Sequence, residues 1–202
     1  MLNILNHYLG TKILQRIEPE ISHAIALCYL RLLNRLVKKK RSITPVLKTK
    51  ICGMELPSPI GLAAGFDKNA EVFNATLSLG FGFVEVGTIT PEPQTGNPKP
   101  RLFRLPDEEA LINKLGFNNK GMLYVSKNVG TPKLGIVGVN IGANAKSINK
   151  VLDYTIIFEF LSCLFDYVTI NVSSPNTKNL RDLQRPEVLE KILQNVNEIN
   201  VS

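Results

Sequence analysis

The sequence Phe83-Val84-Glu85-Val86-Gly87-Thr88-Ile89-Thr90 (residues 83–90) predicts a β-strand that is buried on both faces. Its β-branched and aromatic residues run almost without interruption, as in strands of a parallel sheet that helices cover on both sides. Three further stretches share this pattern, at residues 59–66, 134–141 and 167–172. Helical stretches follow the four strands, at residues 70–79, 120–129, 154–165 and 186–199. Four strand–helix units in succession predict an α/β fold with a parallel sheet and right-handed crossovers. Between the second strand and its helix, residues 101–105 (RLFRL) predict one arm of a hairpin.

Polar residues lie at the end of all four predicted strands. They are Asp67-Lys68-Asn69 after the first, Thr88 in the second, Asn140 and Asn144 around the end of the third, and residues 171–176 (NVSSPN) after the fourth. The carboxyl ends of parallel strands meet at one edge of the sheet, which is the functional edge of α/β proteins. We therefore expect these side chains to form one site.

The predicted site is rich in asparagine, with Asn113, Asn118, Asn140, Asn171 and Asn176 as its candidates. Asparagine offers donors and an acceptor without charge, so several that converge suit a flat ligand with alternating C=O and N–H edges, such as a pyrimidine or a flavin. Lys68 adds a cation for an anionic group, and Ser174 adds a hydroxyl that can pass a proton. The alternative is that these asparagines only cap helices and form turns.

The composition excludes several classes of protein. The chain has 202 residues, 44% hydrophobic and 20% charged, which fits one globular domain. Its three cysteines are far apart, which excludes a disulfide scaffold or a zinc ribbon, and we expect Cys163 in the core. Both histidines, His7 and His23, precede the predicted sheet, so no His-based triad or metal site is expected in the body.

The net charge of +7 is concentrated at the N-terminus. Residues 1–50 hold ten Lys and Arg against two Glu, whereas residues 51–202 hold fourteen against fifteen Asp and Glu. We therefore divide the chain into a basic helical segment, residues 1–41, and a body, residues 42–202. Because the basic residues alternate with Leu and Ile rather than with stacking aromatics, nucleic-acid binding is not expected.

The N-terminal segment carries an apolar stripe at helical spacing that ends in Lys38-Lys39-Lys40-Arg41. The stripe consists of Ile21, Ala24, Ile25, Cys28, Leu32 and Leu36, and residues 2–17 show similar spacing. Its longest uncharged run, Ile21 to Leu30, is too short to cross a bilayer. Two alternatives remain: the helices lie in a membrane interface, or they pack on their own domain.

Six long motifs make the sequence similar to a known family. They are PIGLAAGFDKN (59–69), GFGFVEVGTITPEP (80–93), GNPKPRLFRL (96–105), LINKLGFNNKG (111–121), GVNIGAN (138–144) and DYVTINVSSPNTKNLRDLQ (166–184). With them, the sequence resembles the dihydroorotate dehydrogenases of the membrane-associated, quinone-dependent class (class 2). Serine at position 174, where fumarate-type relatives carry cysteine, favours that class.

The resemblance implies a flavin enzyme on a (β/α)₈ barrel. It would oxidise dihydroorotate to orotate in de novo pyrimidine synthesis, with FMN as hydride acceptor and a quinone as final acceptor. Residues 1–41 would attach it peripherally to the cytoplasmic side of the cell (inner) membrane. By resemblance, the catalytic base is Ser174; FMN is bound by Ala64, Gly65, Phe66, Asp67, Lys68, Thr88, Asn140 and Asn171; and the substrate is bound by Lys68, Asn113, Lys114, Leu115, Gly116, Phe117, Asn171 and Asn176.

The sequence departs from this family in length. Four strand–helix units form the N-terminal portion of a (β/α)₈ barrel, about half of it. The other half is expected to carry a flavin-contacting lysine, another substrate-side asparagine and the phosphate loops. An open half-barrel has unpaired edge strands, so we expect poor solubility, self-association or dependence on a second chain that supplies the missing half. The alternative function is a non-catalytic remnant, or one half of a split enzyme, that binds membrane without redox activity of its own.

Overall fold

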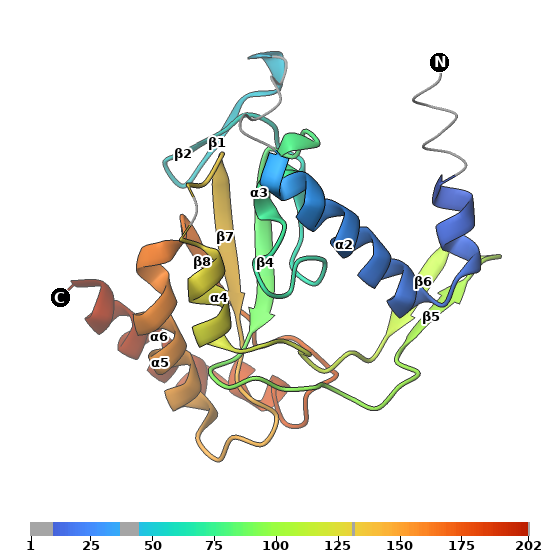
Figure 1. Ribbon diagram of the computed structural model, residues 1–202. Helices are drawn as coiled ribbons and strands as arrows, with labels where there is room; N and C mark the ends of the chain where they lie inside the picture. Colours follow the sequence, from blue (N-terminus) through green and yellow to red (C-terminus); the bar gives the residue numbers. More distant parts are fainter. Residues whose placement is uncertain (1–9, 37–44, 131, 202) are drawn as a thin grey trace.

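A computed structural model describes residues 10–36, 45–130 and 132–201 (Figure 1). Its centre is a four-stranded sheet in the order β3-β4-β7-β8, and all three pairings are parallel. The strands are β3 (Gly61–Leu62), β4 (Phe83–Ile89), β7 (Ile136–Ile141) and β8 (Tyr167–Ile170). The predicted parallel sheet is therefore confirmed, and in the described part of the chain β3 and β8 are edge strands with one neighbour each.

Helices follow the strands as predicted. They are α3 (Phe73–Ser78), α4 (Met122–Asn128), α5 (Lys150–Leu161) and α6 (Pro186–Val201), and α5 and α6 lie side by side in Figure 1. Helix α5 begins four residues before the predicted position because the side chain of Asn149 caps it, accepting a hydrogen bond from the Leu152 N–H at 3.1 Å. The first strand is shorter than predicted, since residues 63–66 leave the sheet for a loop.

The core lies between the sheet and these helices. In β4, Val84 and Val86 are fully buried there, whereas Glu85 between them points to the opposite face because side chains alternate along a strand. Cys163 is exposed, so its predicted place in the core is wrong. Helix α5 ends at Leu161, the chain continues as a 3₁₀ turn (Ser162–Leu164), and Phe165 is the next buried residue.

Two antiparallel hairpins stand outside the main sheet. One joins β1 (Thr49–Ile51) to β2 (Met54–Leu56), and the other joins β5 (Leu102–Leu105) to β6 (Ala110–Asn113). The second contains the predicted arm at residues 101–105. It lies beside the first turns of helix α2 (Pro19–Leu36), where Arg104 donates a hydrogen bond to the Ser22 hydroxyl at 3.3 Å (Figure 1).

Helix α2 packs on the body through one face and exposes another. Leu30 is buried in a small cluster with Val72 and Ala75, and the Asn34 side chain accepts a hydrogen bond from the Ala75 N–H at 2.9 Å. The opposite face exposes an apolar stripe: Ile21, Ile25, Tyr29, Leu32 and Leu36. Of the two alternatives for the predicted stripe, packing on its own domain is wrong for Ile21, Ile25, Leu32 and Leu36, because the row of α2 that contains Leu30 contacts the body instead.

Two parts of the N-terminal prediction lie outside the described residues, namely positions 2–9 and the basic cluster Lys38–Arg41. Residues 10–16 are helical, as the spacing predicts. Within the described part of the chain, each helix is too short or too polar to cross a membrane.

Candidate functional site

A cavity of about 360 Å³ opens at the carboxyl ends of β3, β4, β7 and β8. Of the fifteen residues that the resemblance assigns to catalysis and ligand binding, twelve line it: Ala64, Gly65, Lys68, Thr88, Asn113, Leu115, Gly116, Phe117, Asn140, Asn171, Ser174 and Asn176. The further candidate Asn118 lines it as well. The fold thus brings together residues that are up to 112 positions apart in the sequence, from Ala64 to Asn176. They converge because every contributing strand of a parallel sheet ends at the same edge.

Three of the residues that the resemblance assigns to ligand binding lie outside this cavity, as do Asn69 and Asn144 from the predicted strand-end clusters. Phe66 packs edge-on against the ring of His23, with 5.2 Å between the ring centroids. Asp67 is buried, and its carboxylate accepts hydrogen bonds from the N–H groups of Glu71 and Val72, each at 2.8 Å. Lys114 is exposed and extends over the ring of Phe103. Asp67 therefore holds the turn before α3, and burial raises the pKa of its carboxyl.

The Lys68 ammonium is held against the wall of the cavity. It donates a hydrogen bond to the main-chain oxygen of Gly65 at 2.5 Å. The pKa of Lys68 is lowered to about 8, chiefly by burial; the positive charge of Arg101 also lowers it, while Glu20 and Asp67 act in the opposite direction. The lysine is therefore mostly charged at neutral pH and is a partner for an anionic ligand.

Three side chains from adjacent strands form one hydrogen-bonded group. The Thr88 hydroxyl donates to Asn140 Oδ1 at 2.6 Å. Asn171 Nδ2 donates to both of these residues, at 3.1 Å to Thr88 Oγ1 and 3.0 Å to Asn140 Oδ1. These hydrogen bonds hold the amides of Asn140 and Asn171 in one orientation each. The sequence pattern predicted only that the residues lie close together.

Sequence reasoning missed Glu85 as a member of this group. Its carboxylate lines the cavity and accepts hydrogen bonds from Asn140 Nδ2 and from the Thr169 hydroxyl, both at 2.9 Å. A signal was present in the sequence, because Glu85 is the one charged residue in the otherwise uncharged stretch 83–90. A charged residue in a buried strand needs polar partners.

The loop after β8 carries Ser174 and is held from two sides. Buried Tyr154 of α5 donates a hydrogen bond to the main-chain oxygen of Asn171 at 2.6 Å, and burial raises the pKa of this tyrosine. On the other side, Asn176 Nδ2 donates to the main-chain and side-chain oxygens of Asn113 at 3.3 Å. The Ser174 hydroxyl accepts a hydrogen bond from the Asn176 N–H at 3.3 Å.

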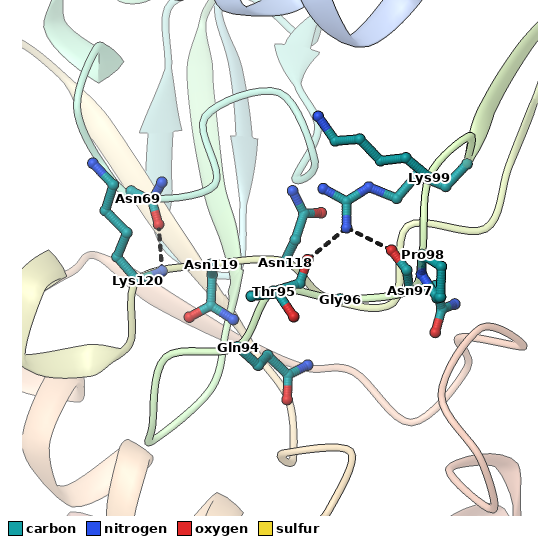
Figure 2. Close-up of a pocket in the computed structure, with 11 residues that line it drawn as sticks. Asn69, Gln94, Thr95, Gly96, Asn97, Pro98, Lys99, Asn118, Asn119 and Lys120 are labelled. Carbon is teal, nitrogen blue, oxygen red and sulfur yellow. Dashed lines mark hydrogen bonds between the residues drawn. The ribbon is translucent and has the colours of Figure 1, made fainter.

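The loop before α4 is fixed by buried Asn119. Its Oδ1 accepts from the Gly121 N–H at 2.8 Å, and its Nδ2 donates to Thr90 Oγ1 and to the Phe117 main-chain oxygen, both at 2.8 Å. A second cavity, of about 590 Å³, opens beside this loop (Figure 2). Figure 2 also shows the Lys120 N–H donating to the side chain of Asn69, which ties this loop to the one after β3.

A third cavity, of about 690 Å³, separates α2 from the body. Polar groups line its α2 side: Glu20 pairs with Arg101 at 2.6 Å, and Arg101 holds the pKa of that carboxyl below its usual range. This cavity shares lining residues with the one at the strand ends: Gly65, Lys68, Asn113, Leu115 and Asn118. The two cavities therefore meet at Lys68.

A model of the dihydroorotate dehydrogenase family matches residues 46–201, more than half of the chain. The chain belongs to the dihydroorotate dehydrogenase family. It is 46% identical over 190 residues to the dihydroorotate dehydrogenase (quinone) of Acinetobacter baylyi and 47% identical over 186 residues to that of Rhodopseudomonas palustris. These matches cover 92% and 91% of this chain, but 56% and 50% of the relatives.

Solved dihydroorotate dehydrogenase structures show the same relation. The Eimeria tenella enzyme in complex with ferulenol superposes with a TM-score of 0.82 at 40% identity, covering 90% of this chain and 50% of that one. Its ligand-free form gives a TM-score of 0.83 at 39% identity. The chain thus spans about half the length of the dihydroorotate dehydrogenases it matches, and its α/β fold is a partial (β/α)₈ barrel, as predicted.

The cavity residues of this family member fit the ring of a flavin. Residues 63–65 (AAG) contribute no side chain larger than a methyl group, and a Cβ added at Gly65 would meet nothing within 4 Å. The amides of Asn140 in β7 and of Asn171, directly after β8, line the same cavity, and the buried Oδ1 of Asn118 has no hydrogen-bond partner. A cavity that combines an open, methyl-lined stretch with such amides is suited to a flat heterocycle with polar edges.

Proposed function

We propose that this chain forms the flavin and substrate end of a dihydroorotate dehydrogenase, which oxidises dihydroorotate to orotate with FMN and a quinone in pyrimidine synthesis. The observation that carries the proposal is the meeting of two cavities at Lys68, one among the amides at the strand ends and one beneath α2. A donor of electrons and an acceptor can then reach one flavin from different sides.

In the proposed site, the amides and Lys68 bind and orient the ligands. The substrate carries a carboxylate, for which the Lys68 ammonium is the cationic partner in the cavity. Asn113, Asn171 and Asn176 offer donors and acceptors to the polar edges of a pyrimidine ring. Thr88, Asn140 and the chain at residues 64–65 would hold the flavin, and FMN would supply the hydride-accepting chemistry.

Ser174 is the proposed base, which takes the proton from the substrate carbon. A serine hydroxyl is a weak base, so this role needs a pocket that orients it and excludes water. Here the Asn176 N–H hydrogen-bonds Ser174 Oγ, and Asn176 in turn contacts Asn113, so one linked group positions base and substrate. Donors around the ring stabilise the charge that develops on its carbonyl groups.

We also propose peripheral attachment to a membrane, on the cytoplasmic face of the cell (inner) membrane; the exposed stripe of α2 supports the attachment itself. Five large apolar side chains along one face of a helix match an interfacial helix. The cavity beneath the same helix, lined by Leu27, Leu102 and Leu111 among others, gives a quinone from the bilayer a route toward Lys68. Ile25→Glu and Leu32→Glu together are expected to abolish binding to anionic vesicles.

The experiment that tests the enzyme proposal is a flavin spectrum. The full chain is purified with detergent, supplied with FMN and mixed with dihydroorotate under anaerobic conditions. Bleaching of the bound-flavin absorption supports the proposal, and Ser174→Ala is expected to bind FMN equally well but to bleach at least about 100-fold more slowly. Failure to bind FMN would overturn it for this chain alone.

The open edges β3 and β8 favour a second candidate, in which the chain works only with a second chain that completes the barrel. Edge strands offer unpaired N–H and C=O groups to any strand that can add to them. The same spectrum, recorded with a separately expressed C-terminal half of a relative, tests this candidate. Flavin binding that appears only in the mixture would support it.

A further inference from the structure

Glu85 lies on the cavity face of β4, where two side chains donate hydrogen bonds to it. They are Asn140 Nδ2 and the Thr169 hydroxyl, each at 2.9 Å. An ionised carboxylate accepts hydrogen bonds and donates none. Each of these neighbours must therefore turn a donor toward Glu85.

This requirement fixes the orientation of the Asn140 amide. Because Asn140 turns its NH₂ group toward Glu85, its Oδ1 points the other way, into the group at the strand ends. There Oδ1 accepts hydrogen bonds from the Thr88 hydroxyl at 2.6 Å and from Asn171 Nδ2 at 3.0 Å. A flipped Asn140 would place its oxygen against the carboxylate, which is repulsive.

The orientation passes on to Asn171 and its loop. Since Asn171 turns its NH₂ group toward Asn140, its Oδ1 faces the loop after β8. That oxygen accepts from the Ser173 N–H at 3.2 Å and from the Ser173 hydroxyl at 3.3 Å. Ser173 directly precedes Ser174. The relay, which is the chain of hydrogen bonds from Glu85 through Asn140 and Asn171 to Ser173, therefore ends beside the proposed base.

We propose that Glu85 is a positioning residue, which sets the donor and acceptor orientation of Asn140 and Asn171 and thereby the amide edges that the cavity presents to its ligands. The effect on flavin and substrate rests on the proposed function, whereas the relay itself is a property of the chain. Glu85 acts through the asparagines and takes no proton in the reaction.

The test is a cycle that exchanges donor and acceptor between two positions. Asn140→Asp places two carboxylates 2.9 Å apart in place of the donated hydrogen bond. Combining it with Glu85→Gln restores the bond in the reverse direction, because the glutamine amide then donates to the carboxylate introduced at position 140. The other oxygen of that carboxylate can still accept from Thr88 and Asn171. Glu85→Gln alone keeps an oxygen for Asn140 and is expected to have a small effect.

Two readouts are followed in the full chain, the midpoint of thermal unfolding and the dissociation constant of FMN from fluorescence quenching. Asn140→Asp alone is expected to lower the midpoint by about 5 °C or more, and the double variant to recover at least about half of that loss. FMN affinity is expected to fall about 10-fold in the single variant and to return to within about threefold of wild type in the double variant. The control, Thr169→Val with Asn140→Asp, removes a partner of Glu85 without supplying a donor and should rescue neither readout.

The proposal is overturned if Asn140→Asp lowers the midpoint of thermal unfolding and the FMN affinity as much with glutamine at position 85 as with glutamate. Where Asn140→Asp alone fails to fold, recovery of folded protein in the double variant supports the relay, and failure of both variants overturns it. Absence of FMN binding in every variant would refute the proposed function, while the unfolding midpoints would still decide the relay.

Discussion

Raising the pH should stabilise this chain through Lys68. Burial lowers the pKa of the Lys68 ammonium from 10.5 to about 8, so the folded state disfavours its charge. At about pH 7 this lysine is protonated in the folded and the unfolded chain, and the folded chain bears the full cost of burying the charge. Between about pH 8 and 10.5 only the unfolded chain retains the proton, so the free energy of unfolding rises with pH there.

The size of this stabilisation follows from how far the pKa of Lys68 is lowered. A shift of about 2.5 units at 1.36 kcal/mol per unit corresponds to about 3 kcal/mol in total. Between about pH 7 and pH 10, most of it, about 2.5 kcal/mol, should appear. Lys68→Met removes the titrating group, so the wild-type chain should gain about that much free energy of unfolding relative to this variant over the same interval.

The assay is equilibrium unfolding in urea, followed by circular dichroism at several pH values and one protein concentration. Lys127→Met is the matched control, because it removes an exposed lysine and keeps the buried one. The reasoning is refuted if the wild-type chain and Lys68→Met show the same dependence of unfolding free energy on pH. It also fails if the two curves separate only below pH 7.

Three further changes give sharp expectations. Asn119→Asp loses two donated hydrogen bonds of a buried amide and should cost about 3 kcal/mol of unfolding free energy; a cost below about 0.5 kcal/mol in urea unfolding would contradict this. Gly138→Ala would put a Cβ 2.1 Å from the ring of Tyr167, so a lower thermal midpoint is expected and an unchanged one would show that the ring moves freely. Tyr154→Phe removes the hydrogen bond to the Asn171 carbonyl, so it should lower the free energy of unfolding by about 1 kcal/mol and weaken FMN binding in a fluorescence titration. An unchanged unfolding free energy together with unchanged FMN affinity would contradict the role of Tyr154 in holding the loop after β8.

For helix α2, the sequence pattern predicted the helix correctly but did not predict which of its faces packs on the body. The spacing of apolar residues predicted the helix, and Pro19–Leu36 is helical. The helix carries more than one apolar row, however, and periodicity does not say which one meets the body. Asn34 and Leu30 face α3, so the row with Ile25 and Leu32 is left exposed.

The sequence by itself determined the order of strands and helices and the placing of polar residues at the strand ends. Both depend on local information: uninterrupted apolar runs favour buried strands, and parallel strands share one functional edge. The long motifs also identified the family. The partial barrel follows from the count of four units, and the sheet of β3, β4, β7 and β8 agrees with it.

Only the tertiary structure decided which of these polar side chains face the cavity and in which orientation. Asp67 belongs to the same motif as Lys68, yet its carboxylate caps a turn while the ammonium lines the cavity. Glu85 acquires its partners from β7 and β8, which lie more than 50 residues further along the chain. A hydrogen bond requires a partner within about 3 Å and in the right direction, and the packing of distant strands alone sets both.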